Sequence, residues 1–222
     1  MKGNIKIMKP YKYAVFDLDG TILDTAEDLA DSVNHALLLH GFPLRSLDEV
    51  KLFIGNGVSN LISRAVPEGI TDQQFSDVFS AFRNHYATNM INKTAPFPGI
   101  KELLLELKKR EVKVSIASNK YQKGVEELCE RYFPGLYTAA FGEREGVKRK
   151  PDPSIIFSAM ERMGANAKET IYIGDSEVDS ETAKNAGIDF IGVSWGLRPK
   201  SLLIDSGAVT VVDNTEQLLE FF

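Results

Sequence analysis

Four short polar groups in this sequence contain the residue types that nucleophilic, acid–base and cation-binding chemistry requires. In chain order they are Asp17-Leu18-Asp19-Gly20-Thr21, Ser118-Asn119-Lys120, Lys150-Pro151 and Gly174-Asp175-Ser176-Glu177-Val178-Asp179. Carboxylates act as nucleophiles, as general acids and bases, and as ligands of hard cations such as Mg²⁺. Lysine and serine side chains can stabilise negative charge that develops during a reaction.

Each group also has an ordinary structural explanation. An Asp-x-Asp pair often only caps a helix, and acids such as Asp175 and Asp179 are favoured at helix N-termini. Ser118 has a residue type common in turns, and Lys150 could be a solvated charge beside two other basic residues. Chemistry is favoured by the joint position of the groups, because all four lie at or near the carboxyl ends of predicted strands.

Hydrophobic periodicity predicts the elements that position these groups. Tyr13–Phe16 is a short apolar run that ends at Asp17, which is typical of a buried strand. Beyond residue 100, helical and strand patterns alternate. The predicted helices are 100–110, 122–132, 154–163, 177–186 and 216–222, and the predicted strands are 112–117, 138–141, 170–173, 190–193 and 209–212. Such alternation predicts an α/β fold with a Rossmann-like parallel sheet, and ligands bind at the carboxyl ends of the strands in such sheets.

Residues between the first and second strands have only helical periodicity. Thr25, with Asp28 three positions later, predicts the N-cap of a helix that ends before Gly41. Further helices are predicted at 50–54, 58–66 and 75–90. Pro96-Phe97-Pro98-Gly99 resists helix and central strand, so we place a hinge there. We therefore expect a catalytic core of residues 1–22 and 94–222 with an inserted all-helical cap domain of residues 23–93.

The four motifs, in this order, resemble those of the haloacid dehalogenase superfamily of phosphohydrolases. That superfamily carries an Asp-x-Asp-x-Thr, a Ser or Thr, a Lys and a paired Gly-Asp-x-x-x-Asp. The resemblance extends over residues 13–193 and includes a helical cap of the C1 type, closed by Pro98-Gly99. The resemblance implies a core with the haloacid dehalogenase (HAD) fold and the activity of a magnesium-dependent phosphatase.

The resemblance implies a role for each residue. Asp17 is the nucleophile that forms an aspartyl-phosphate, and Asp19 is the acid that protonates the leaving group and later the base that activates water. Ser118 and Lys150 balance the charge on the phosphoryl oxygens. The remaining motif residues that contact the phosphate or hold the turn are Thr21 and Asn119.

The same resemblance implies a Mg²⁺ site. Its ligands are the Asp17 carboxylate, the Asp19 backbone carbonyl and the Asp175 carboxylate, together with a substrate oxygen. Asp179 supports these ligands without touching the ion.

Asp19 distinguishes phosphatases and phosphomutases from the dehalogenases of the superfamily, which lack an acid there. The segment Phe53-Ile54-Gly55-Asn56-Gly57, followed by Arg64, resembles phosphoglycolate phosphatases and implies 2-phosphoglycolate as substrate. Gly55, Asn56 and Gly57 would then face the substrate and Arg64 its carboxylate, although a plain turn between helices explains the glycines equally well. A mutase similar to β-phosphoglucomutase, a pyrophosphatase and a phosphate-binding regulatory protein are the alternatives.

Composition limits the partners. The net charge is −5, and basic residues are scattered among acidic ones, so a nucleic-acid partner is not expected. No apolar run approaches the roughly 20 residues of a membrane span, and Met1 to Pro10 lacks the apolar core of a signal peptide. We expect a cytoplasmic monomer or homodimer that binds a small phosphorylated metabolite.

Overall fold

The computed structural model describes residues 10–208 and 210–222. Nearly all of the segment considered as a signal peptide, residues 1–9, lies outside the described residues. Val209, the first residue of the last predicted strand, also lies outside them. No helix within the described ranges is both long and apolar enough to cross a membrane.

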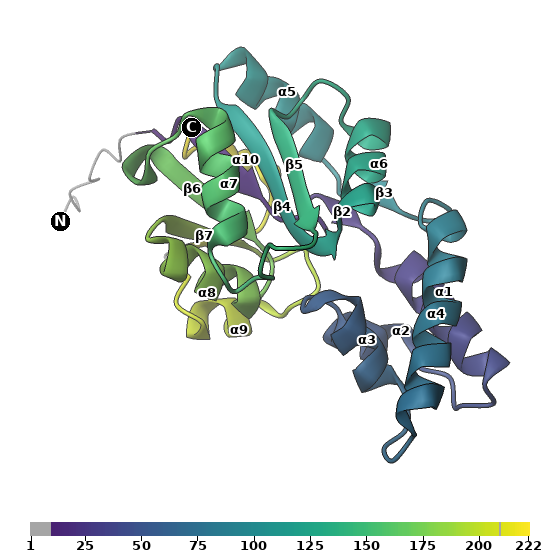
Figure 1. Ribbon diagram of the computed structural model, residues 1–222. Coiled ribbons are helices and arrows are strands. Elements are labelled where there is room, and N and C mark those ends of the chain that lie inside the picture. Colours follow the sequence, from purple (N-terminus) through teal and green to yellow (C-terminus); the bar gives the residue numbers. More distant parts are fainter. Residues whose placement is uncertain (1–9, 209) are drawn as a thin grey trace.

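The core of the molecule is a sheet of six parallel strands (Figure 1). The strands are β1 (Tyr13–Phe16), β4 (Lys113–Tyr121), β5 (Ala139–Glu143), β6 (Thr170–Gly174), β7 (Asp189–Val193) and β8 (Thr210–Val212). Their order is β5-β4-β1-β6-β7-β8, and Phe16 at the end of β1 lies opposite Ile116 and Ile173. The central strand therefore ends beside β4 and β6, which carry the second and fourth polar motifs.

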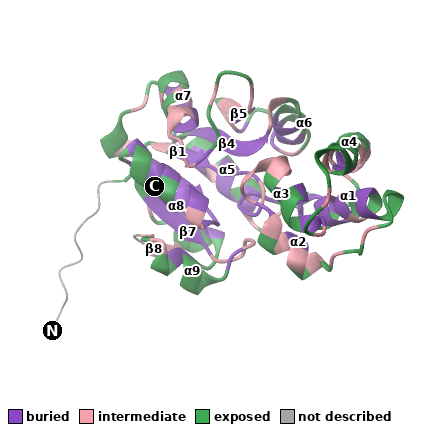
Figure 2. Cartoon of the chain, turned by 60° about the horizontal axis from the view of Figure 1, so that its bottom comes forward, coloured by how far each residue is buried: buried purple, intermediate pink, exposed green. Residues whose placement is uncertain are grey.

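Alternate residues of the strands pack into hydrophobic cores on opposite faces of the sheet. Ala14 and Phe16 face one core, and Val15 faces the other. The first face is covered by α5 (Ile100–Lys109), α6 (Gln122–Tyr132) and α10 (Thr215–Leu219), and the second by α7 (Ser154–Met163), α8 (Glu177–Ala186) and α9 (Lys200–Asp205). Figure 2 shows the buried strands between these helices. The predicted α/β fold with a parallel sheet is confirmed.

Four helices form a separate group beside the carboxyl edge of the sheet (Figure 1). They are α1 (Ala26–Leu39), α2 (Leu47–Phe53), α3 (Gly57–Ala65) and α4 (Asp72–Asn89). The chain enters and leaves this group through β2 (Leu23–Asp24) and β3 (Ala95–Pro96), which pair antiparallel. The sequence pattern predicted these helices but neither of the two short strands. Pro96 is tolerated in β3 because β3 is an edge strand.

The structure differs from the predicted elements in two other places. Strand β4 does not end at Ala117 but continues to Tyr121, with a register shift against β5 between these residues. Ser118, Asn119 and Lys120 consequently lie in the strand and not in the loop after it. The short helix α9 was not predicted at all.

Candidate active site

The polar motifs converge at the carboxyl edge of the sheet, where residues of the first three motifs line a cavity of about 50 Å³. Asp17 follows β1, and its backbone N–H donates to the Ile173 carbonyl at 2.9 Å, which fixes the start of the turn. The motif residues in the cavity wall are Asp17, Asp19, Ser118, Asn119, Lys120 and Lys150. The α-helical group supplies the opposite, mainly apolar wall.

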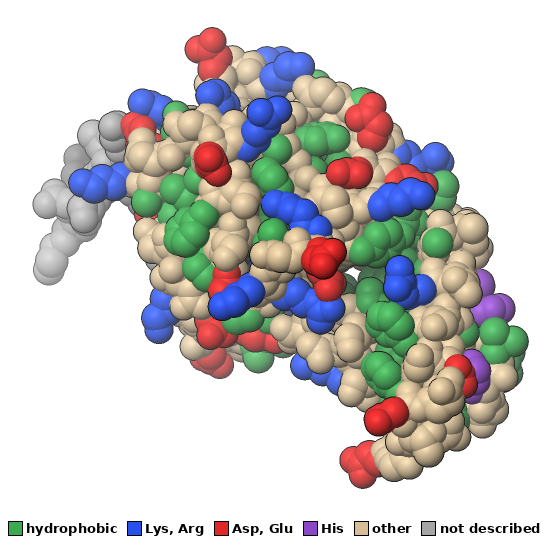
Figure 3. Space-filling view, viewed as in Figure 1, with side chains coloured by type: hydrophobic (Ala, Val, Ile, Leu, Met, Phe, Trp, Pro, Cys, Tyr) green, Lys and Arg blue, Asp and Glu red, His purple; other side chains and the backbone are tan. Residues whose placement is uncertain are grey.

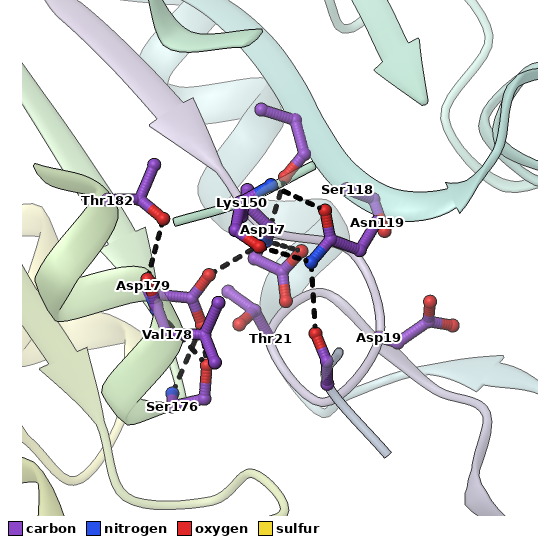
Figure 4. A network of polar contacts seen from close by, with 12 residues as sticks. Asp17, Asp19, Thr21, Ser118, Asn119, Lys150, Ser176, Val178, Asp179 and Thr182 are labelled. Atoms are coloured by element: carbon purple, nitrogen blue, oxygen red, sulfur yellow. Dashed lines mark hydrogen bonds and ion pairs between the residues drawn. The ribbon is translucent and has the colours of Figure 1, made fainter. Parts of the chain in front are cut away.

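Lys150 is the centre of a buried polar network, shown in Figure 4. Its Nζ lies 2.7 Å from Asp17 Oδ1, 2.8 Å from Asp179 Oδ1 and 2.8 Å from Tyr172 Oη. Burial lowers the pKa of Lys150, but the charges of Asp17 and Asp179 outweigh this effect and the pKa lies above its ordinary value. Lys150 is therefore a permanent cation next to the predicted nucleophile.

Asn119 holds the backbone of Lys150 in place. Its Oδ1 accepts from the Lys150 N–H at 2.8 Å, and its Nδ2 donates to the Lys150 carbonyl at 3.1 Å. The same Nδ2 lies 3.2 Å from the Gly55 carbonyl. The structure thus places Asn119 between the lysine loop and the helical group. Its predicted contact with phosphate stays a prediction.

Three buried carboxylates form a cluster beside Lys150. Asp17, Asp175 and Asp179 each offer an oxygen within 4.8 Å of the other two. Asp175 accepts hydrogen bonds from Thr21 Oγ1 at 3.0 Å and from the Leu197 N–H at 2.7 Å. When all three are ionised, they exceed the lysine by two negative charges, and an oxygen-rich site with that excess fits a divalent hard cation.

The electrostatics of the cluster also favour a cation. Burial, opposed by Lys150 but reinforced by Asp179 and Asp175, raises the pKa of Asp17 well above its ordinary value. Burial, followed by the charge of Asp179, raises the pKa of Asp175 to about 7. A cation bound here would favour the ionised carboxylates, and its binding would release protons from the cluster.

Asp179 has its oxygens occupied by protein groups. Oδ1 accepts from Lys150 and from Tyr172 Oη, while Oδ2 accepts from Ser176 Oγ at 2.5 Å and from the Ser176 N–H at 3.1 Å. Ser176 Oγ in turn accepts from the Asp179 N–H, which completes a capping box at the start of α8. The helix-capping explanation therefore holds for Asp179, and capping aims its carboxylate at Lys150. Asp175 is not the capping residue.

Two glycines make this close approach possible. Gly20 has a φ of +89°, and a Cβ on it would lie 2.4 Å from Asp175 Oδ2. A Cβ on Gly174 would lie 2.5 Å from the Asp179 side chain. Any larger residue at either position would push a carboxylate out of the cluster.

Asp19 stands apart from the cluster, on the other side of the turn (Figure 4). Its Oδ1 accepts hydrogen bonds from Lys120 Nζ and from Thr25 Oγ1, both at 2.8 Å. The prediction that the Thr25 hydroxyl caps α1 is wrong, because no capping hydrogen bond forms and the hydroxyl donates to Asp19 instead. The structure therefore separates the two aspartates of the first motif.

The helical group brings only some of its predicted residues to the cavity. Gly55 and Gly57 line it, whereas Asn56 does not, and the Asn56 carbonyl accepts a hydrogen bond from Asn60. Arg64 is exposed and is not a lining residue. Its Nη1 donates to the carbonyls of Leu52 and Phe53, at 3.4 and 3.3 Å.

Four residues at or near the site had no role predicted from the sequence. Tyr172, Tyr86, Lys120 and Arg198 have buried side chains. The two tyrosines occupy apolar positions of a strand and a helix, where they resemble core residues. Arg198 donates to the carbonyls of Lys51 and Ile54 at 2.7 and 2.6 Å, a contact between distant segments that no local pattern indicates. Only Lys120 had a sequence signal, because it follows Ser118-Asn119.

A second and larger hollow adjoins the cavity. It measures about 530 Å³ and shares Val58 and Tyr86 with the cavity. Figure 3 shows the surface hollowed between α4 and the loop after β5, with both basic and acidic side chains around it. The hollow and the cavity therefore adjoin at Val58 and Tyr86.

Known proteins are similar to this chain in sequence and fold. A phosphoglycolate phosphatase from Mesorhizobium japonicum is 34% identical over 190 residues, which cover 82% of this chain and 82% of that protein. A provisionally assigned phosphoglycolate phosphatase from Lactobacillus delbrueckii subsp. bulgaricus has a solved structure that is 36% identical. The TM-score is 0.91, and the match covers 96% of this chain and 98% of that chain. A predicted phosphoglycolate phosphatase from Haemophilus somnus is 28% identical with a TM-score of 0.89, over 96% and 98% of the two chains.

A family model described as haloacid dehalogenase-like hydrolase matches residues 14–193. The matched range contains all four polar motifs and the whole helical group. The structural neighbours repeat the arrangement of sheet and helices over almost the full length of the chain. This chain therefore belongs to the haloacid dehalogenase-like hydrolases.

Proposed function

We propose that this protein is a magnesium-dependent phosphatase that hydrolyses 2-phosphoglycolate through an aspartyl-phosphate on Asp17. Its family and its phosphoglycolate phosphatase relatives identify a phosphoric monoester hydrolase. The observation that carries the finer proposal is the position of Asp17. One of its carboxylate oxygens is held by Lys150, and the same side chain lines the cavity beside a carboxylate cluster that fits a cation.

The first step is attack of an Asp17 oxygen on the phosphorus. Of the two Asp17 carboxylate oxygens, only Oδ1 forms a hydrogen bond within the described residues, to Lys150. Oδ2 is therefore the oxygen available for attack. As the bond from phosphorus to the leaving oxygen breaks, that oxygen takes a proton from Asp19, which lines the same cavity. The products of this step are the free alcohol and phosphorylated Asp17.

The second step regenerates the enzyme. Asp19, now ionised, takes a proton from a water molecule as the water oxygen attacks the phosphorus. The bond to Asp17 breaks, and inorganic phosphate leaves. Throughout, Lys150 and Ser118 balance negative charge on the phosphoryl oxygens.

Mg²⁺ is the proposed cofactor because the site consists of oxygen ligands. The Asp17 and Asp175 carboxylates, with the Asp19 carbonyl, would hold it, and Asp179 would orient the group through Lys150 and Ser176. When bound, Mg²⁺ supplies a charge that lowers the barrier to approach of an anionic nucleophile to a phosphate. The excess of carboxylates over cations supports this assignment.

The choice of 2-phosphoglycolate is supported by the relatives and by the small cavity. The matched proteins from Mesorhizobium japonicum and Lactobacillus delbrueckii are named for this substrate. The cavity of about 50 Å³ suits a small leaving group, whereas a sugar or nucleotide would have to extend into the adjoining hollow of about 530 Å³.

A phosphate-release assay over a substrate panel tests the proposal. The panel contains 2-phosphoglycolate, glucose 6-phosphate, a nucleoside monophosphate, pyrophosphate and an aryl phosphate, each with Mg²⁺ and with EDTA. We expect release that requires Mg²⁺ and is fastest with 2-phosphoglycolate. Interconversion of glucose phosphates without release would support a mutase instead, and no reaction with any compound would support a phosphate-binding protein.

A further inference from the structure

Tyr86 carries a buried hydroxyl that has no hydrogen-bond partner among the described residues. It comes from α4 in the helical group, is 1% exposed, and lines the cavity that Asp17 and Asp19 also line. Within the described chain its hydroxyl makes no hydrogen bond. An unsatisfied buried hydroxyl costs about 1–3 kcal/mol, so such a group in a native structure calls for a ligand or another explanation.

Lys120 faces the same cavity from the core, at the end of β4. Its Nζ lies 4.9 Å from the centroid of the Tyr86 ring, and its side chain is 4% exposed. An ammonium group has three N–H donors. The structure records one hydrogen bond for Lys120 Nζ in the described residues, to Asp19 Oδ1. Within the part of the chain that the structure describes, the Lys120 ammonium group from the core and the Tyr86 hydroxyl from the helical group therefore both have free donors in the same small cavity.

The position of these donors relative to Asp19 indicates what they bind. Asp19 is the proposed acid, so the leaving oxygen of the substrate must lie against its carboxylate. Lys120 Nζ is 2.8 Å from that carboxylate. A substituent on the carbon that bears the leaving oxygen would thus lie beside Lys120 and Tyr86. Only an acceptor, and best an anion, satisfies an ammonium and a hydroxyl together.

The other basic residues of the site are engaged elsewhere. Lys150 binds Asp17 and Asp179, and Arg198 binds backbone carbonyls and Glu177. Arg64, the residue predicted to bind a substrate carboxylate, does not line the cavity. Lys120 is therefore the cavity-lining cation that remains for a second anionic group.

We propose that Lys120 and Tyr86 form the specificity site for a carboxylate attached to the carbon that bears the phosphoester oxygen. This inference rests on the proposed phosphatase function and adds the residues that select its substrate class. The two residues come from opposite walls, so a bound carboxylate also ties the helical group to the core.

Tyr86→Phe tests the proposal with a matched pair of substrates. 2-Phosphoglycolate carries the carboxylate, and n-propyl phosphate carries an ethyl group in its place. We expect kcat/KM for 2-phosphoglycolate to fall about 10- to 100-fold in Tyr86→Phe, the range for one hydrogen bond to a charged group. For n-propyl phosphate kcat/KM should stay within about twofold, because the lost hydroxyl has no partner there.

Two controls accompany this variant. Tyr121→Phe removes a hydroxyl in the adjoining hollow that donates to the Met90 sulfur at 3.5 Å. This variant should leave kcat/KM for both substrates unchanged. Thermal unfolding of ligand-free Tyr86→Phe should match or exceed wild type, since the removed hydroxyl is unsatisfied. Lys120→Met should reduce turnover of 2-phosphoglycolate more than that of n-propyl phosphate.

The outcomes separate this inference from the proposed function. Equal wild-type efficiency on the two substrates, or an equal loss on both in Tyr86→Phe, would overturn the specificity site and leave the phosphatase intact. If the wild-type protein released phosphate from neither substrate and from no aryl phosphate, the proposed function itself would fail.

Discussion

Lys150 and the carboxylates around it form one buried cluster, in which removing one charge leaves another without its partner. The lysine contacts Asp17 and Asp179 directly, and Asp175 completes the acidic group. Burying unpaired charge is costly, so these residues stabilise one another only as a set with a cation. The chemistry and the local stability of this edge of the sheet therefore depend on the same contacts.

The raised pKa of Asp175 predicts opposite effects of pH with and without metal. Burial, followed by the charge of Asp179, raises this pKa to about 7, while an unfolded Asp has a pKa of about 3.9. Between these values the folded state holds a proton that the unfolded chain has lost. The contribution of Asp175 to the free energy of unfolding of the metal-free protein therefore falls as pH rises from about 4 to about 7.

Mg²⁺ bound at this cluster would displace that proton, so its stabilising effect should grow over the same pH interval. We expect the rise in Tm caused by Mg²⁺, relative to EDTA, to be larger at about pH 7.5 than at about pH 5.5. Asp175→Asn, which cannot take up the proton, should flatten this dependence. Equal Mg²⁺ effects at both pH values in the wild-type protein would contradict the assignment of Asp175 to the metal site.

Sequence alone could predict the residues whose position follows from a strand end. Asp17, Ser118 and Asp175 converge because parallel strands share one edge, and apolar runs predicted those strands. Tyr86 and Arg198 could not be predicted in this way. Each acts across a contact between the helical group and the core, and the local sequence around each is typical of an ordinary helix or loop.

At the scale of elements, Asp28 in the first turn of α1 holds the two crossings of the helical group together. Its buried carboxylate accepts from the Lys93 N–H at 3.0 Å and from the Thr94 N–H at 2.8 Å, just before β3. This contact lies next to the β2–β3 pair. The Asp28 carboxylate thus holds the Lys93–Thr94 backbone and does not take part in the helix cap that the sequence predicted for Thr25 and Asp28.

Removing this carboxylate should destabilise the protein. Asp28→Ala leaves the part-buried Lys93 N–H and the buried Thr94 N–H without this acceptor, and we expect a loss of about 2–3 kcal/mol in the free energy of unfolding. Urea denaturation measures it. Asp31→Ala, which removes an exposed ion pair with Lys93, is the matched control and should cost much less. Equal costs would show that the Asp28 clamp contributes no more than a surface charge pair.

The long periodic elements were predicted closely, whereas short ones were not. Helices α6, α7 and α8 occupy the predicted ranges. Strands β2 and β3 have two residues each, too few for any periodicity, and they are defined only by pairing with each other. The extension of β4 to Tyr121 depends on a register shift against β5, which a single strand does not encode.

At the scale of the whole molecule, the helical group covers the site. Leu29, Ile54, Val58, Leu61 and Tyr86 form its wall of the cavity. Arg198 holds the end of α2 to the core by its bonds to Lys51 and Ile54. We expect substrate exchange to separate these contacts, with the β2–β3 connection as the hinge.

We predict that the helical group rotates relative to the sheet when ligand binds. Crystal structures with Mg²⁺, and with or without vanadate as a phosphate analogue, would measure the rotation. Changes in φ and ψ should concentrate at Leu23–Asp24 and Ala95–Gly99, near the predicted hinge. Identical orientations in the two crystals would contradict this opening and closing.

The central claim about this protein is that Asp17 is the nucleophile that attacks phosphorus. With an aryl phosphate, whose leaving group needs little protonation, Asp19→Ala should still form the phosphoenzyme but hydrolyse it slowly, because the base is missing. We predict that acid quench and peptide mass spectrometry of this variant find one phosphoryl group on Asp17. Asp17→Asn should show no adduct and lose about 10³-fold or more of its activity while keeping its fold. An adduct on another residue, or an active Asp17→Asn protein, would contradict the account.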